Sequence, residues 1–247
     1  MRLLVLLLAL LSGKLAAEPL RVAVAANFRT TLESIADAYR EETGVELKLS
    51  SASTGVLYSQ ALFGAPFDLL LAADSQRPAL LVESGHALDD SLTTYALGKL
   101  VLAYSAGLAD KEENADIPVL LASQGLTLAM ANPELAPYGR AAMEVLARAP
   151  LEASSRTLTA PNVGQAFQMW FSGGADLALV AASYRPQPGL EIPANWYRPI
   201  AQQAVILAGS NREQGARDFL DFLSGPTSQA IILAAGYDVP GRESAHE

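Results

Sequence analysis

The chain has 247 residues, 26 of them acidic and 17 basic, and it contains no cysteine. A net charge of −9 without clusters of basic residues argues against a nucleic-acid partner, because such a surface repels phosphate backbones. Without cysteine, neither disulfide bonds nor a lipid anchor at a cysteine can form, so stability has to come from a hydrophobic core, which a chain of this length can build.

The first residues have the pattern of a cleavable export signal. Arg2 supplies a positive charge, residues 3–11 are uninterrupted apolar residues, and Ala17 is a small residue of the kind that signal peptidases require. The apolar run is shorter than the roughly 18 residues of a membrane span. The sequence therefore predicts a signal peptide over residues 1–17 and a periplasmic mature protein; a buried N-terminal helix is the alternative.

Short apolar segments alternate with amphipathic ones, which is typical of an α/β protein with largely parallel sheets. In the first part of the chain, strands are predicted at 20–25, 45–50 and 67–72, and helices at 28–42, 55–63 and 77–84. In the second part, strands are predicted at 97–104, 126–131, 176–181 and 204–207, and helices at 139–149, 164–172, 213–223 and 228–235.

This order predicts two lobes with a cleft between them. The chain would cross between the lobes near residues 94–98 and again near 200–204, so that its C-terminal part returns to the first lobe. The expected first lobe comprises residues 18–95 and 204–240, and the expected second lobe comprises residues 96–203. Residues 241–247 are expected to form a flexible tail.

Four junctions between a strand and a helix share one chemistry. They are Ala25 to Asn27, Ser51 to Gly55, Ala136 to Gly139 and Pro161 to Gly164. At a helix start the backbone N–H groups lack partners within the helix, and the helix dipole favours negative charge. Small residues and hydroxyl groups let an anion approach and add further donors.

The same four loops contain no Lys, Arg, His, Asp or Glu, which restricts the kind of anion they could bind. A fully deprotonated dianion accepts hydrogen bonds only, whereas a protonated phosphate needs a carboxylate to accept its proton. No Asp or Glu occurs in the loops, and this disfavours phosphate. Each loop alone is an ordinary helix cap, so the prediction of an anion site depends on all four converging.

Several stretches resemble the periplasmic molybdate-binding proteins of ABC importers. In chain order they are AVAANFRTTLESIADAYREETG, SSASTGVLYSQALFGAPFDLLLAAD, YALGKLVL, ANPELAPYGRAAMEVL, NVGQAFQMWFSGGADLALV, QQAVIL and FLDFLSGPTSQAIILAAGYDVP. They cover nearly the whole chain after the leader. The resemblance implies a type II periplasmic-binding-protein fold, with two lobes of mainly parallel sheets and two hinge crossovers.

The resemblance also implies a function and a site. A protein of this kind is a monomeric, non-enzymatic binding protein without a cofactor, which captures molybdate and tungstate and delivers them to a membrane permease. Residue by residue, Ala26 and Asn27 would offer a backbone N–H and the Asn27 amide, and Thr54 its N–H and hydroxyl. Tyr138 would donate its hydroxyl and Val163 its backbone N–H.

Two departures from the family pattern bear on selectivity. Many relatives have serine at the positions of Asn27 and Thr54, and the extra methyl group of Thr54 would narrow the pocket. Another branch supplies its tyrosine from the strand that corresponds to residues 176–181, where this chain has Ala181. The combination of Asn27 and Tyr138 is therefore interpreted as an alternative form of the site.

Other functions remain open on the sequence alone. A hydrolase would need a nucleophile and a base, but the chain has only His86 and His246 and no GxSxG motif. A site for a metal ion could use Tyr184 and Tyr197, although the absence of cysteine disfavours a transition metal. Another oxyanion such as sulfate is a further alternative, and a sensory module would usually carry a DNA-binding or membrane domain.

Overall fold

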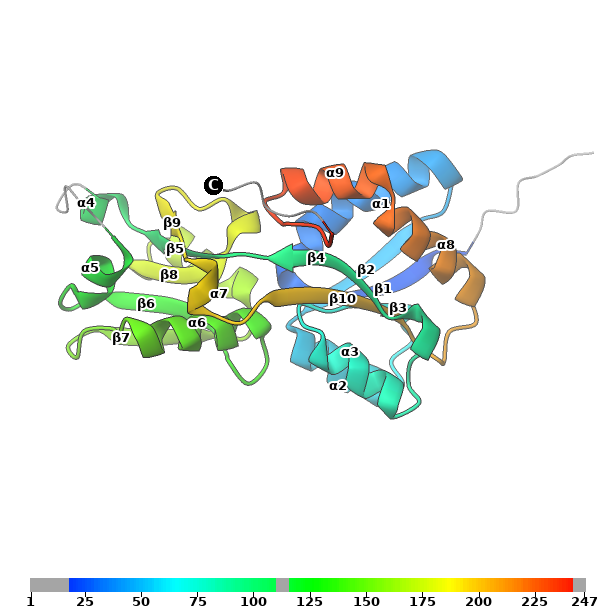
Figure 1. The fold of residues 1–247 in the computed structure, drawn as a ribbon, viewed down its shortest axis with the longest axis horizontal. Helices are drawn as coiled ribbons and strands as arrows, with labels where there is room; N and C mark the ends of the chain where they lie inside the picture. Colours follow the sequence, from blue (N-terminus) through cyan, green and yellow to red (C-terminus); the bar gives the residue numbers. More distant parts are fainter. Residues whose placement is uncertain (1–17, 110–115, 242–247) are drawn as a thin grey trace, which may run out of the picture.

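The computed structural model describes residues 18–109 and 116–241 and shows two α/β lobes side by side (Figure 1). A five-stranded sheet forms the centre of each lobe, in the order β2-β1-β3-β10-β4 in the first lobe and β7-β6-β8-β5-β9 in the second. The two-lobed α/β prediction is confirmed. The expected signal peptide and residues 242–247 of the expected tail lie outside the described residues.

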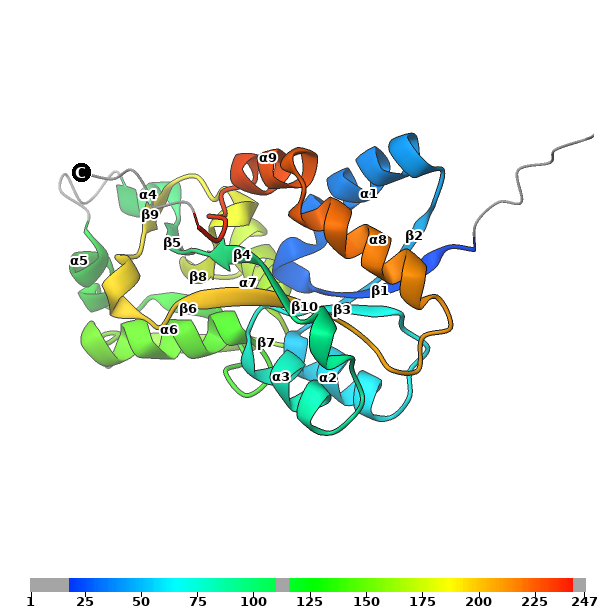
Figure 2. The ribbon, with the colours of Figure 1, turned by 45° about the vertical axis from the view of Figure 1, so that its right-hand side comes forward.

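The first lobe combines the two ends of the described chain. Its strands are β1 (Leu20–Ala25), β2 (Leu47–Ala52), β3 (Leu69–Leu71), β4 (Thr93–Gly98) and β10 (Ile200–Ile206). Its helices are α1 (Arg29–Thr43), α2 (Thr54–Leu62), α3 (Gln76–Glu83), α8 (Glu213–Ser224) and α9 (Pro226–Ala234), with the 3-10 turns η1 (Ala26–Phe28) and η2 (Asp89–Ser91). Helices α1, α8 and α9 cover one face of the sheet, and α2 and α3 cover the other (Figure 2).

Strand β1 illustrates why the apolar segments form buried strands. Val22 and Val24 pack into the cluster formed with α1, α8 and α9, whereas Ala23 between them packs with Leu57 of α2 on the opposite face. Successive side chains of a strand point to opposite faces, so a sheet covered on both sides needs apolar residues throughout. Helix α1 ends at Gly44, whose φ of 77° is a left-handed conformation that suits glycine.

The second lobe is continuous in sequence. Its strands are β5 (Leu100–Tyr104), β6 (Thr127–Ala131), β7 (Arg156–Ala160), β8 (Leu177–Ala181) and β9 (Gly189–Glu191). Its helices are α4 (Ala106–Ala109), α5 (Ile117–Ala122), α6 (Pro137–Arg148) and α7 (Val163–Phe171), with the 3-10 turns η3 (Ala182–Tyr184) and η4 (Ala194–Trp196). Ala25 and Ala73 of the first lobe belong to the same apolar cluster as the core of this lobe, so the lobes are packed against each other.

Two strands carry the chain between the lobes. Only Lys99 separates β4, in the first sheet, from β5, in the second. Strand β10 brings the chain back, antiparallel to β4, with Ile200 paired to Gly98. Residues 96–98 and 200–203, which the sequence assigned to the second lobe, thus form hydrogen bonds in the first sheet.

Both sheets are mixed, which the largely parallel pattern expected from the sequence did not specify. Strands β1, β2 and β3 are parallel, as are β6, β7 and β8. Strand β10 is antiparallel to β3 and β4, and β5 is antiparallel to β8 and β9. Strand β10 returns from the other lobe without a helical crossover. It can therefore run antiparallel to its neighbours in the first sheet.

The predicted elements agree closely with the structure, with a few exceptions. The apolar run at 97–104 is divided between β4 and β5, and strands β7 and β9 and helices α4 and α5 were not predicted. Within the described ranges, no helix combines the length and the apolar character that crossing a membrane requires.

Candidate functional site

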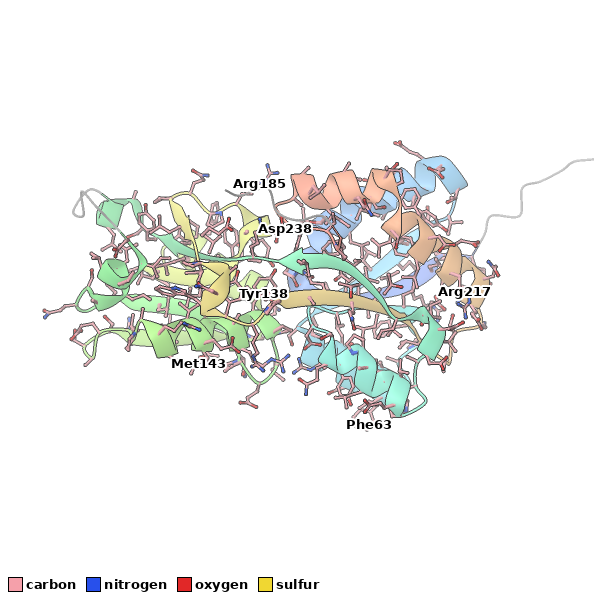
Figure 3. All side chains as sticks on the ribbon, viewed as in Figure 1. Phe63, Tyr138, Met143, Arg185, Arg217 and Asp238 are labelled. Carbon is pink, nitrogen blue, oxygen red and sulfur yellow. The ribbon has the colours of Figure 1, made fainter. Side chains whose placement is uncertain are left out.

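The register of the parallel strands brings the four predicted loops together. Ala25 at the end of β1 pairs with Ala52 at the end of β2, and Ala131 of β6 pairs with Ala160 of β7. Parallel strands that end together place their following loops at one edge of the sheet, where ligands of α/β proteins commonly bind. The two edges face each other across the junction of the lobes, and Figure 3 shows Tyr138 at this junction.

A small cavity lies between these loops. It is lined by Ala25, Ala26, Asn27, Ser53, Thr54, Ala73, Ala136, Pro137, Tyr138, Asn162 and Val163. The structure thus brings together all five residues that the sequence predicted as oxyanion contacts. The cavity has a volume of about 10 Å³, and none of the side chains that line it is charged.

Three hydroxyl groups make the cavity a site for hydrogen-bond donation. Among the described residues, the buried Ser53 Oγ and Tyr138 OH have no hydrogen-bond partner. Thr54 Oγ1 accepts the N–H of Ala73 at 3.0 Å, and its own hydrogen remains available to a ligand. Buried polar groups are rarely left without a hydrogen-bond partner. Unpaired hydroxyls beside a cavity therefore indicate that a bound ligand supplies the missing partner.

Backbone N–H groups at helix starts add to these donors. Thr54 and Val163 are the first residues of α2 and α7, where N–H groups have no partner within the helix. The dipoles of these helices favour negative charge at the same ends. Asn162 caps α7, because its side-chain oxygen accepts the N–H of Gln165 at 3.0 Å.

The Asn27 side chain has a different role from the one expected. Its amide nitrogen donates to Gln202 Oε1 at 2.8 Å and to Tyr237 OH at 3.1 Å. The backbone carbonyl oxygen of Asn27 accepts hydrogen bonds from Tyr237 OH at 2.7 Å and from Ser183 Oγ at 3.1 Å. Both amide hydrogens are therefore used inside the protein. Asn27 holds the loop in place, and its backbone N–H remains as the group that can contact an anion.

Ser53 is a site residue that the sequence reasoning missed. It occupies the N-cap position of α2, but its side chain makes no capping hydrogen bond. The stretch Ser51 to Gly55 contained the signal, since an N-cap serine next to the predicted contact Thr54 can turn its hydroxyl outward. Whether it caps the helix or faces the cavity depends on the tertiary structure.

The residues of the alternative functions do not assemble a site. His86 is exposed and its Nδ1 lies 3.1 Å from Ser84 Oγ, while His246 lies outside the described residues. Tyr184 OH donates to the carbonyl oxygen of Ala26, and Tyr197 OH accepts the N–H of Leu100. Among the described residues, no group of three or more His, Asp or Glu side chains is arranged to hold a metal ion.

Burial keeps the tyrosines at the junction protonated. Desolvation is the main cause that raises the pKa of Tyr95, Tyr138 and Tyr184 well above the ordinary value, and it raises the pKa of Tyr237 to about 12. Neighbouring tyrosines add a smaller effect at Tyr138. Tyr138 is consequently a hydrogen-bond donor, and not an anion, at any physiological pH.

We expect these raised pKa values to make the protein sensitive to alkali. Above about pH 10 the unfolded tyrosines lose their protons while the buried ones retain them, so the free energy of unfolding falls as pH rises. The slope should be about 1.4 kcal/mol per pH unit for each such tyrosine. Denaturant titrations between pH 7 and pH 11 test this. A free energy of unfolding that is constant above pH 9 would contradict it, and Tyr138→Phe should reduce the slope.

An ion-pair cluster joins the two lobes beside the cavity. Arg140 of α6 donates to Asp74 of the first lobe at 2.6 Å and to Gln76 Oε1 at 2.8 Å. Arg77 pairs with the same Asp74 oxygen at 2.7 Å and donates to the carbonyl oxygen of Glu134, in the second lobe, at 2.9 Å. The Arg140–Asp74, Arg140–Gln76 and Arg77–Glu134 contacts cross between the lobes, whereas the Arg77–Asp74 pair lies within the first lobe.

We expect Asp74→Asn to weaken ligand binding through closure. The substitution keeps the size of the side chain but removes the negative charge that accepts the hydrogen bond of Arg140 across the lobes, and a hydrogen bond to a charged group contributes about 1.5–3 kcal/mol. The apparent affinity for the ligand should fall about tenfold, because a smaller fraction of the protein closes. Asp37→Asn, which removes the Asp37–Arg40 pair inside α1, is the control, and calorimetry is the measurement. Equal affinities for the two variants would contradict the expectation.

Comparisons with known proteins identify the family to which the chain belongs. The family model for bacterial extracellular solute-binding proteins matches residues 20–238. The molybdate-binding protein ModA of Azotobacter vinelandii is 38% identical over 246 residues, covering 94% of this chain and 96% of the relative. The molybdate-binding protein ModA of Rhodobacter capsulatus is 35% identical over 223 residues, covering 87% of this chain and 86% of the relative.

A solved structure resembles the whole fold. The periplasmic molybdate-binding protein of Azotobacter vinelandii matches with a TM-score of 0.83 and 39% identity, covering 90% of this chain and 99% of that chain. These relatives are named as binding proteins and not as enzymes. The chain therefore belongs to the family of bacterial extracellular solute-binding proteins.

Proposed function

We propose that this protein captures molybdate, and also tungstate, in the cavity between its lobes and delivers the ion to the permease of an ABC importer. In this proposal it acts as a monomer in the periplasm, after removal of residues 1–17. Residues 18–98 with 200–240 and residues 99–199 move as two lobes about the ends of the strands β4 and β10, where the chain passes between the two sheets. The ligand contacts are Ala26, Asn27, Thr54, Tyr138 and Val163, joined by Ser53.

The observation that carries the proposal is a buried cavity that offers donors and no carboxylate. Ser53, Thr54 and Tyr138 supply hydroxyls, and the starts of α2 and α7 supply N–H groups. A tetrahedral dianion presents four oxygens that only accept hydrogen bonds, so it satisfies all these groups together. A protonated phosphate would leave its own hydrogen without an acceptor.

The small size of the cavity supports closure around the ligand. A volume of about 10 Å³ is roughly what one water molecule needs, and a four-oxygen anion is larger. The ion therefore has to enter while the lobes are apart and be enclosed as they approach. Enclosure removes water from the site and strengthens each charge-assisted hydrogen bond. Binding would thus shift the population toward the closed form, which the permease can distinguish from the open one.

Ion size should decide selectivity. Molybdate and tungstate are nearly equal in size, while sulfate is smaller and would leave some donors too far away. Each hydrogen bond to the anion that is not made costs about 1.5–3 kcal/mol, so two such losses weaken binding by about 100-fold or more. The same argument predicts little discrimination between molybdate and tungstate.

Calorimetric titration of the protein without residues 1–17 tests the proposal. Molybdate and tungstate should bind tightly and with similar affinity, and sulfate and phosphate at least about 100-fold more weakly. A preference for sulfate would favour the alternative of a different oxyanion. Binding of ferric ion, without binding of any of the four oxyanions, would favour the alternative of a metal-ion carrier. Either result would overturn the proposal.

A further inference from the structure

Gln202 lies in the hinge strand β10 and is completely buried. The pairing of β10 with β4 is irregular at this residue: Gln202 pairs with Ala96, while Gln203 pairs with Thr94, so Tyr95 has no partner of its own. A β-bulge of this kind bends the strand and redirects a side chain, and bulges are frequent next to functional sites. At this irregularity, Gln202 contacts Asn27, which lines the ligand cavity.

The oxygen of the Gln202 side chain supports the first-lobe part of the cavity. Gln202 Oε1 accepts the amide N–H of Asn27 at 2.8 Å and lies 3.2 Å from the hydroxyl of Tyr95, which has a second acceptor in the carbonyl oxygen of Ala72 at 3.1 Å. Asn27 belongs to the loop whose backbone faces the cavity. Because Oε1 is turned toward Asn27, the nitrogen of the same amide points in another direction.

The nitrogen of Gln202 lies near Tyr138, in the second lobe. Among the described residues, Gln202 Nε2 and Tyr138 OH are both buried and both lack a hydrogen-bond partner. A Cβ atom placed on Gly98 would lie 3.0 Å from Gln202 Nε2 and 2.3 Å from Tyr138 OH, so both atoms adjoin the same point. A donor and a hydroxyl, each unpaired and buried, are thus neighbours at the hinge.

We propose that Gln202 is a positioning residue for Tyr138, donating from Nε2 to the phenolic oxygen when the oxyanion is bound. This inference rests on the proposed function of the cavity. A phenol has one hydrogen to donate and lone pairs that accept. When the amide N–H occupies a lone pair, the phenolic hydrogen is directed to the oxyanion. The hydrogen bond also polarises the hydroxyl, which makes it a stronger donor.

The same amide then links donors from both lobes. Gln202 Oε1 fixes the Asn27 loop of the first lobe, while Nε2 fixes the Tyr138 hydroxyl of the second. The residue lies in a strand that connects the lobes, so the two donor groups come into register as the lobes close. A purely structural glutamine would stabilise the hinge, but its effect on affinity would not depend on Tyr138.

A double-mutant cycle distinguishes these roles. Molybdate affinity is measured by calorimetry for the wild type, Gln202→Met, Tyr138→Phe and the double variant. Met removes the amide while retaining similar length. We expect Gln202→Met to lower affinity about tenfold or more in the wild-type background and clearly less in the Tyr138→Phe background, because the target of Nε2 is then absent. Equal losses in the two backgrounds would overturn the proposal.

A second variant, Gln202→Glu, provides the same test if Gln202→Met does not fold. Gln202→Glu keeps an oxygen toward Asn27 and replaces the donor with an acceptor that competes for the Tyr138 hydrogen. Its loss of affinity should likewise be larger in the wild-type background than in the Tyr138→Phe background, and equal losses would again overturn the inference. Thermal unfolding without ligand identifies any variant that does not fold. If the wild type does not bind molybdate, the proposed function fails; if it binds but the cycle is additive, only the role of Gln202 fails.

Discussion

Replacing Tyr138 with phenylalanine is expected to lower molybdate affinity by about 10- to 100-fold without destabilising the ligand-free protein. The hydroxyl is buried and has no partner within the described structure, so its removal leaves no other group unpaired. A buried polar group without a hydrogen bond costs stability, and the variant should therefore unfold at the same temperature or higher. The lost affinity corresponds to one charge-assisted hydrogen bond to the anion.

The combination of lower affinity and undiminished stability is the diagnostic result for Tyr138→Phe. Tyr39→Phe provides a matched control, because Tyr39 is also buried but packs against Phe219 and Phe222 and does not line the cavity. It should leave affinity unchanged. Calorimetry measures the affinity and thermal unfolding the stability. Unchanged affinity in Tyr138→Phe would mean that Tyr138 does not contact the ligand.

Gly98→Ala is expected to reduce molybdate affinity at least as much as the loss of the Tyr138 hydroxyl, by about 100-fold. The added methyl group would lie 2.3 Å from Tyr138 OH, a distance at which the phenol ring has to move. The ring is buried, and overpacking of this kind costs about 1–3 kcal/mol. Gly98 is the last residue of β4, and a methyl group there would push the Tyr138 hydroxyl out of the cavity.

Gly209→Ala is the matched control for this substitution. An added Cβ at Gly209 meets no atom within 4 Å, and Gly209 lies after β10, outside the residues that line the cavity. It should bind molybdate like the wild type. Titration of both variants gives the comparison, and a Gly98→Ala protein with wild-type affinity would show that the hinge tolerates a side chain next to Tyr138.

Much of the fold could be predicted because the apolar segments carry their own signals. Strand β8 is an uninterrupted apolar run, and helix α1 combines apolar residues at helical spacing with a terminal glycine. Strand β7 could not be found in this way, since its sequence RTLTA is largely exposed and it pairs only with β6 at the edge of the sheet. Its strand conformation comes from this pairing and not from a local apolar pattern.

The sequence also did not show that the apolar run at 97–104 belongs to two sheets. Leu97 and Leu100 have the same apolar character, and Lys99 between the strands is not a break that a local pattern indicates. The division arises because β4 pairs with β10 in one lobe while β5 pairs with β8 and β9 in the other. Such a change of partner depends on contacts between residues far apart in the chain.

The sequence by itself determined the α/β class, the four loops rich in small and polar residues, and the absence of carboxylates from them, because composition and local order decide these features. Only the tertiary structure decided that the loops meet at one cavity, that the Asn27 amide is engaged by Gln202 and Tyr237, and that Ser53 faces the cavity without capping its helix. The physical reason is that hydrogen bonds of buried polar groups are made with residues distant in sequence. Which donors remain for a ligand follows from how the two sheets pack together.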